Sequence, residues 1–169
     1  MRFVPRKVAL CAFFAASLAF SLLPGVAAAD DPDVVPFFGL GGCLANDGKA
    51  TVTADETFYL RFGWGAKTRG QVMEYIRAAS DTITIDGTVH TDAGDYWGDI
   101  FFEPGPPAHW RAWVFYPVEA PSAGETLSVT LDLIVSHRLH DGISKLENGR
   151  FEFVGPGNWL TVSCEITAA

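Results

Sequence analysis

Apolar and polar residues alternate along several short segments of this chain, which is the pattern of a β-strand with one buried face. In the longest, residues 126–138, Leu127 and Val129 fall on one face and Ser128 and Thr130 on the other. Clusters of Gly, Pro, Asp and Asn separate these segments and indicate turns. The pattern predicts further strands at residues 50–53, 57–62, 82–85, 88–90, 110–116, 151–154 and 159–167, and an edge strand around 100–102 within a mixed loop.

One segment follows a different period. Val72 and Tyr75 belong to a set of apolar residues at helical spacing, which predicts one helix over residues 69–79. Thr68 and Gln71 have the spacing of a capping box, in which two side chains satisfy the first free amides of a helix. The helix is therefore expected to begin near residue 69.

Roughly seven to nine short strands separated by Gly and Pro turns predict a mainly β protein. The expected fold is an antiparallel β-sandwich, immunoglobulin-like in size, with one inserted α-helix near residues 69–79. A true immunoglobulin domain carries its cysteines on two facing strands, whereas here they lie at the two ends of the domain. The strand topology therefore stays open at this point.

The first 29 residues have the order of a secretory signal peptide. Three basic residues precede an apolar run at 8–23, and small residues fill positions 26–29, so cleavage is expected before Asp30. The apolar run has 16 residues, fewer than the roughly 20 that span a bilayer. We therefore expect a secreted or extracytoplasmic protein without a membrane segment after cleavage.

The remaining chain divides into an extended arm at 30–42, rich in Asp, Pro and Gly, and one β-sandwich domain at 43–169. This part holds two cysteines, Cys43 near its start and Cys164 near its end. Exported proteins fold in an oxidising environment, and the alternating pattern places Cys164 on the inward face of the last strand. We therefore predict a disulfide between the two.

The charge of the chain limits its partners. The formal net charge is −8, and removal of the leader leaves nine basic residues against 20 acidic ones, a net charge of −11. Nucleic-acid binding depends on Lys and Arg contacts to phosphates. Nucleic acid is therefore not expected as a partner, whereas a protein or a glycan is compatible with the surface.

Acidic residues are concentrated in one loop-rich stretch between strands. Calcium prefers several hard oxygen ligands from flexible loops, so the candidate ligands are Asp92, Asp95, Asp99 and Glu103. Their spacing does not match an EF-hand, and a solvated acidic loop is the simpler interpretation. Calcium is the one cofactor that the sequence suggests.

Histidines give a second candidate. His137, His140 and Asp141 lie close in sequence, and His90 lies elsewhere, so a metal or hydrolytic site requires the fold to bring them together. The chain has no nucleophile elbow, phosphate-binding loop or zinc-protease helix signature. A small secreted hydrolase, metal-dependent or not, therefore stands as the alternative function, and surface histidines as the simpler interpretation.

Loop aromatics give a third candidate. Trp64 and Trp97 each lie beside glycines in predicted loops, and Tyr96 adjoins Trp97. Exposed indoles stack on sugar faces or anchor protein partners, which makes these three residues a candidate ligand platform. Alternatively, the rings fold back and close the ends of the core.

The segment from Phe62 to Gly70, with the sequence Phe-Gly-Trp-Gly-Ala-Lys-Thr-Arg-Gly, resembles one found in uncharacterised secreted bacterial β-sandwich proteins of immunoglobulin-like type. This resemblance covers a small part of the chain and implies no known activity. The leading hypothesis is a secreted or cell-surface, non-enzymatic β-sandwich module with a binding or structural role. The sequence leaves its ligand and its oligomeric state open.

Overall fold

The computed structural model describes residues 32–38 and 42–169. The predicted signal peptide at 1–29 and its cleavage site lie outside the described residues, as do parts of the arm. The elements, in chain order, are β1 (Val34–Pro36), the 3-10 turn η1 (Cys43–Ala45), β2 (Lys49–Val52), β3 (Thr57–Ala66), α1 (Arg69–Ala78), β4 (Thr82–Ile85), β5 (Thr88–His90), the 3-10 turn η2 (Ala93–Tyr96), β6 (Phe101–Glu103), β7 (His109–Glu119), β8 (Thr126–Val135) and β9 (Gly157–Ala168).

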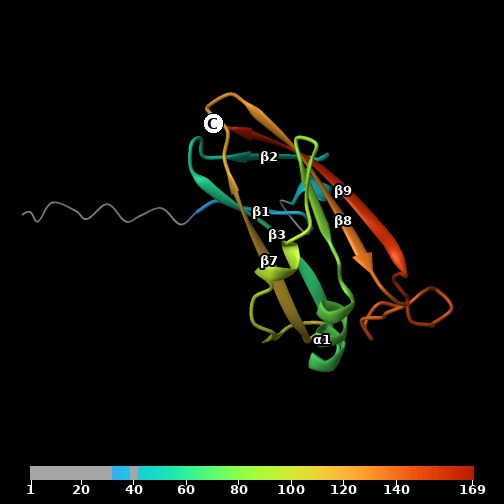
Figure 1. Ribbon diagram of the computed structural model, residues 1–169. Helices are drawn as coiled ribbons and strands as arrows, with labels where there is room; N and C mark the ends of the chain where they lie inside the picture. The colour runs from blue at the N-terminus through green and yellow to red at the C-terminus, as the bar shows by residue number, and fades with distance from the viewer. Residues whose placement is uncertain (1–31, 39–41) are drawn as a thin grey trace, which may run out of the picture. The chain divides into compact units, whose positions relative to one another are not determined.

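These strands form two sheets, with the orders β1-β3-β7-β6 and β2-β9-β8-β4-β5. Inward side chains of both sheets, among them Leu60, Val114, Leu131 and Ile166, form one buried cluster. The mainly β, sandwich-like fold with one helix is thus confirmed. Within each sheet, β3 and β7 on one side and β8 and β9 on the other form the longest ladders (Figure 1).

The sheets are mixed rather than strictly antiparallel. β1 runs parallel to β3, and β2 runs parallel to β9. Parallel neighbours need a crossover instead of a hairpin, and both short strands belong to the segment that precedes β3. The chain uses this segment to cover one edge of each sheet, an arrangement that alternation alone does not predict.

Several predicted strands differ from the structure in extent, among them β8, which ends at Val135 rather than 138, and β7, which runs to Glu119 rather than 116. β3 continues past residue 62 to Ala66, because every residue from Thr57 to Ala66 pairs with β7. The segment 151–154 forms only the isolated bridges Leu139↔Val154 and Lys145↔Phe151, so it is not a regular strand. The predicted edge strand near 100–102 is β6, which pairs with β7.

The helix lies where its period predicts. Thr68 and Gln71 form both hydrogen bonds of the capping box, and α1 buries Val72, Tyr75 and Ala78. It crosses from β3 of one sheet to β4 of the other and packs at one end of the sandwich (Figure 1). In the part of the chain that the structure describes, no helix is long and apolar enough to cross a membrane.

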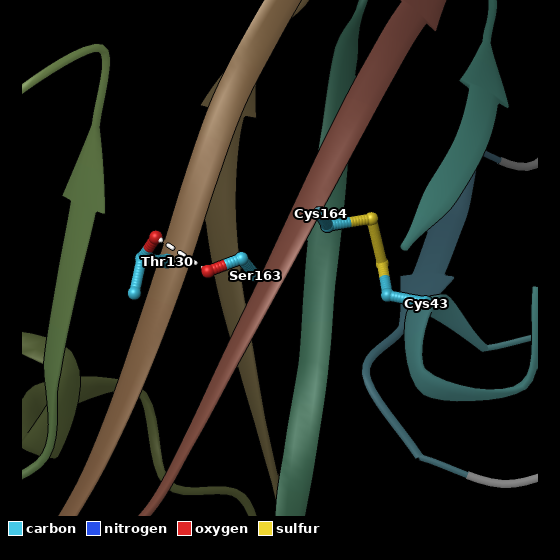
Figure 2. Close-up of a disulfide and its surroundings, with 4 residues drawn as sticks. All are labelled: Cys43, Thr130, Ser163 and Cys164. Carbon is cyan, nitrogen blue, oxygen red and sulfur yellow. Dashed lines mark hydrogen bonds between the residues drawn. A yellow bond between two sulfur atoms is a disulfide. The ribbon is translucent and has the colours of Figure 1, made fainter. Parts of the chain in front are cut away.

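The disulfide between Cys43 and Cys164 is confirmed, with a Cα–Cα distance of 5.5 Å. It ties η1 to the middle of β9. Figure 2 shows Cys164 directed toward Cys43, while Ser163 points toward Thr130 of β8, and their hydroxyl oxygens are 3.0 Å apart. The alternation along β9 therefore gives Cys164 the inward orientation that the sequence predicts.

Candidate functional site

The candidate ligand platform does not form one exposed surface. Trp64 stacks on Tyr75 of α1 with ring centroids 4.4 Å apart, and Tyr75 meets Trp97 edge-on at 6.0 Å. Tyr96 packs instead against Tyr116, at 4.9 Å. Because Trp64 shares the inward face of β3 with buried residues, its ring lies against the helix and is half-buried.

The acidic candidates are also separated. The Asp92 carboxylate accepts a hydrogen bond from the Tyr116 hydroxyl at 3.2 Å, whereas Glu103 contacts Arg111 at 2.9 Å and His109 at 3.2 Å. Among residues 32–38 and 42–169, no three His, Cys, Asp or Glu side chains form a group that could hold a metal ion. Asp92, Asp95, Asp99 and Glu103 therefore form no such group in this structure.

The histidines of the hydrolase hypothesis have separate neighbours. His137 lies 3.5 Å from Glu74 on the surface of α1, and the His140 ring stacks on Phe151 at 5.0 Å. The Asp141 carboxylate accepts hydrogen bonds from the backbone amides of residues 143 and 144, so it fixes a turn. His90 lies on β5, an edge strand of the five-stranded sheet, near Tyr116.

The structure instead reveals a cavity of about 440 Å³ on the side of the sandwich formed by β3 and β9. We call it the tryptophan groove. Its lining combines three indoles with a few polar side chains, and includes Trp64, Trp113, Trp159, His109, Arg111 and Asp141. Three of these residues come from β7, Trp64 from β3, Trp159 from β9 and Asp141 from the loop before β9.

The groove exists because the covering strands are short. β1 pairs with β3 only as far as Arg61, and β2 pairs with β9 only from Glu165 onward. Beyond these points β3 and β9 lack an outer neighbour among the described strands. The groove is lined by residues of both uncovered edges, which leaves the space between the sheets open at this end.

A β-bulge places one of the three indoles. In the ladder of β8 and β9, Leu133 pairs with Leu160, but Ile134 pairs with Asn158. Trp159 is therefore the extra residue of β9, and bulges of this kind redirect a side chain. The Trp159 ring meets the Trp64 ring edge-on, with centroids 5.9 Å apart, and the two form the inner wall of the groove.

Two glycines of β3 shape the outer wall. A Cβ atom on Gly63 would collide with the backbone oxygen of Ala112 in β7 and lie 2.9 Å from Cε3 of Trp113, and one on Gly65 would lie 2.9 Å from Cδ2 of His109. Real Cβ contacts are longer than this, so a side chain at Gly63 would push the backbone of β7 away, and one at Gly65 would force His109 to move. The Phe-Gly-Trp-Gly sequence thus provides an inward indole between two positions that carry no side chain on the outer face of the strand.

Cations flank the outer indole. The guanidinium groups of Arg61 and Arg111 lie 5.1 Å and 4.6 Å from the Trp113 ring, within the range of cation–π attraction. Arg111 and His109 share the Glu103 carboxylate. Within the described residues no carboxylate lies within ion-pair distance of Arg61, whose Nε is buried without a hydrogen-bond partner.

Trp64 of the inner wall stacks on Tyr75, which is buried and lies near the charge of Asp81. Burial raises the pKa of the Tyr75 hydroxyl, and the nearby charge of Asp81 raises it further. Burial also raises the pKa of Asp81 to about 6, although the hydrogen bond from the backbone amide of Ile134 opposes this shift. Asp81 is 5% exposed and is the one buried charged side chain of the described part. In that part, the Nε1 of Trp64 is also buried without a hydrogen-bond partner.

We compared the chain with known proteins. No family model matches it, and no curated protein matches it. A solved cysteine protease inhibitor from Entamoeba histolytica aligns over 81% of this chain and 94% of its own length, with 7% sequence identity and a TM-score of 0.30. A TM-score this low carries no argument about function, so the groove must be interpreted from its own chemistry.

Proposed function

We propose that this protein is an exported, non-enzymatic β-sandwich module that binds a protein or glycan ligand in the tryptophan groove. The observation that carries the proposal is the cavity of about 440 Å³ lined by three tryptophans at the uncovered edges of β3 and β9. Ligand sites are concave and largely apolar, with a few polar groups that fix orientation. The groove has both properties.

The indoles of the groove differ in what packing explains. Trp64 and Trp159 contact the buried cluster around Tyr75 and Val135, so they serve the fold as well as the groove. Trp113 faces outward from β7 opposite Gly63 and belongs to none of the buried clusters. A half-buried tryptophan without a core role supports a binding function, because Trp supplies a large rigid contact area at low entropic cost.

Export is supported by two independent features. The first 29 residues follow the order of a signal peptide, and the bond between Cys43 and Cys164 suits an oxidising compartment. The excess of acidic over basic residues disfavours a strongly anionic ligand, so negative charge on the ligand is expected only beside Arg61 and Arg111 at Trp113.

Binding is better supported than hydrolysis. His109 and Glu103 form a His–carboxylate contact at the groove, but Arg111 occupies the same carboxylate. The lining contains no Ser, Thr or Cys that could act as a nucleophile beside His109. The histidines at 137 and 140, on which the hydrolase hypothesis depends, contact Glu74 and Phe151 instead.

The proposal is tested by a binding screen. The full chain, recovered after expression with its disulfide intact, is titrated with panels of glycans and peptides while tryptophan fluorescence is recorded. Trp113→Ala is expected to weaken binding by about tenfold or more. The matched control is Val89→Ser on β5, where the side chain is 61% exposed and distant from the groove. Absence of binding to both panels, or equal affinity of Trp113→Ala and wild type, contradicts the proposal.

A further inference from the structure

Within the described residues, Gly63 and Gly65 of β3 have no backbone hydrogen-bond partner on the side facing away from β7. The amide of Tyr59 donates to Asp33 at 2.8 Å, and the Arg61 carbonyl accepts from Phe37 at 2.9 Å. Both residues therefore turn their peptide groups toward the β1 side. Because peptide groups of a strand alternate in direction, Gly63 and Gly65 turn theirs to the same side.

The stretch of β3 at Gly63 and Gly65 has backbone hydrogen bonds on both sides of it. Before Gly63, Arg61 is paired with the β1 segment, and after Gly65, the Lys67 amide donates to the carbonyl of Asp141 at 2.7 Å. Gly63 and Gly65 lie between them with no strand beside them among the described strands, and both line the groove. An uncovered strand edge with its donors and acceptors free is a template for another chain.

We propose that the ligand of the groove is an extended peptide segment of a partner protein, which adds as a strand to β3 at Gly63 and Gly65. The inference rests on the proposed function, since it takes the groove as the binding site, and it names the class of ligand. Strand addition draws its affinity from main-chain hydrogen bonds and its specificity from pockets for alternate side chains.

The walls of the groove define the side chains of such a peptide. Residues on one face of the added strand would lie beside Trp64, Trp159 and Leu160, which offer an apolar surface. Residues on the other face would lie along the row of Arg61, Gly63 and Gly65, next to Trp113. Alternate side chains of the peptide therefore meet an apolar wall and a cationic wall.

Charge favours an acidic residue on the outer face of the peptide. Arg61 has no carboxylate partner in the described part, whereas Arg111 and His109 share Glu103. The Asp141 carboxylate at the far end accepts hydrogen bonds from its own turn. Arg61 lies 5.1 Å from the Trp113 ring and can pair there with an acidic side chain of the peptide. The expected ligand thus alternates acidic and apolar residues.

The first test uses synthetic probes. Capped seven-residue peptides in which Glu alternates with Val, Leu or Tyr are titrated against the disulfide-intact protein, with Lys-for-Glu peptides as the charge control. N-methylation of alternate amides distinguishes the mode of binding, because only one parity of amides faces β3. We expect methylation at one parity to weaken binding by about tenfold or more and methylation at the other to have little effect. Equal sensitivity of both parities overturns strand addition.

The second test observes β3 itself. In the free protein, the amides of Gly63 and Gly65 are expected to exchange faster than those of Phe62 and Trp64, which face β7. Saturation with a bound peptide should slow exchange at Gly63 and Gly65 by about tenfold, while the amides of β5 stay unchanged. Peptide binding without this protection overturns the inference.

The glycan panel separates this inference from the proposed function. If a glycan binds in a manner sensitive to Trp113→Ala and no alternating peptide binds, the groove is a ligand site and strand addition is overturned. If neither panel binds, both proposals are overturned. If Arg61 pairs with a Glu of the peptide, the Lys-for-Glu peptides should bind about fivefold or more weakly than the Glu peptides. Equal affinity of the two series contradicts an acidic side chain at Arg61.

Discussion

β3 and β9 each run through two different environments. In the sealed half, defined by Leu60, Ile166 and the disulfide, β1 and β2 cover the strand edges, and both residues are fully buried. In the open half, defined by Trp64 and Trp159, the cover is missing and the side chains are half-buried. The same strands thus build a core at one end and a groove at the other.

The difference shows how small a change in strand length opens a groove in this fold. Both halves use inward side chains of comparable hydrophobicity, and the ladders with β7 and β8 continue through both. What changes is the length of the two cover strands, which have three and four residues. The disulfide stands near the boundary, because Cys164 directly precedes the first residue of β9 that pairs with β2.

The largest expected effect concerns the disulfide of the sealed half. Cys43 and Cys164 are 121 residues apart, and closing a loop of this size stabilises by about 4–5 kcal/mol in the chain-entropy model. The double variant Cys43→Ala/Cys164→Ala should lose free energy of unfolding of this order in urea titrations. A loss below about 1 kcal/mol would show that the cover strands hold without it.

Truncations in the two halves should differ in their cost. Leu60→Ala removes a fully buried side chain and is expected to lower the free energy of unfolding by about 2–5 kcal/mol. Trp113→Ala on the outer wall of the groove should cost less than about 1 kcal/mol, because this residue lies outside the buried clusters. Equal costs in urea titrations would make Trp113 a structural residue and weaken the case for the groove.

The free energy of unfolding should depend on pH through Asp81, which lies at the end of the open half. Burial raises its pKa from 3.8 to about 6 in the folded protein, so the folded state favours the protonated acid. Its contribution to stability is present below about pH 4 and is lost as the pH rises through about 6, a change of about 2–3 kcal/mol.

Asp81→Asn tests this dependence, since the amide oxygen can still accept the hydrogen bond from Ile134. Relative to wild type, the variant should gain about 2–3 kcal/mol between pH 4 and pH 7. Urea titrations at four pH values measure the difference. A constant difference across this range would mean that Asp81 titrates as an ordinary carboxylate.

The smallest expected effect concerns the cap of α1, the helix behind the groove. Thr68→Ala removes the side-chain acceptor for the Gln71 amide and should cost about 1 kcal/mol. Thr68→Ser keeps the hydroxyl and serves as the control. If groove binding is unchanged in both variants, the helix end is structural, whereas a loss of affinity in Thr68→Ala alone couples the end of α1 to the groove.

Patterns local in sequence predicted most of the fold. The capping box at Thr68 and the inward orientation of Cys164 depend on residues a few positions apart, and both are confirmed. The candidate sites fared differently, because they require residues from distant strands to meet. Trp64 lines the groove, whereas Trp97 packs on the same Tyr75 without lining it and Tyr96 packs against Tyr116. The alternating pattern gives no sign that Trp113 faces a glycine.

The amino-acid sequence by itself determined the mainly β fold class, the position of the helix and the disulfide, because periodicity, capping and the number of cysteines are properties of the chain alone. The tertiary structure decided where the cover strands end, which residue of β9 bulges and which indoles share a wall. These depend on strand register, which is set by the fit of side chains across the whole core. The groove therefore depends on strand register. Its first and last tryptophans, Trp64 and Trp159, are 95 positions apart in the chain.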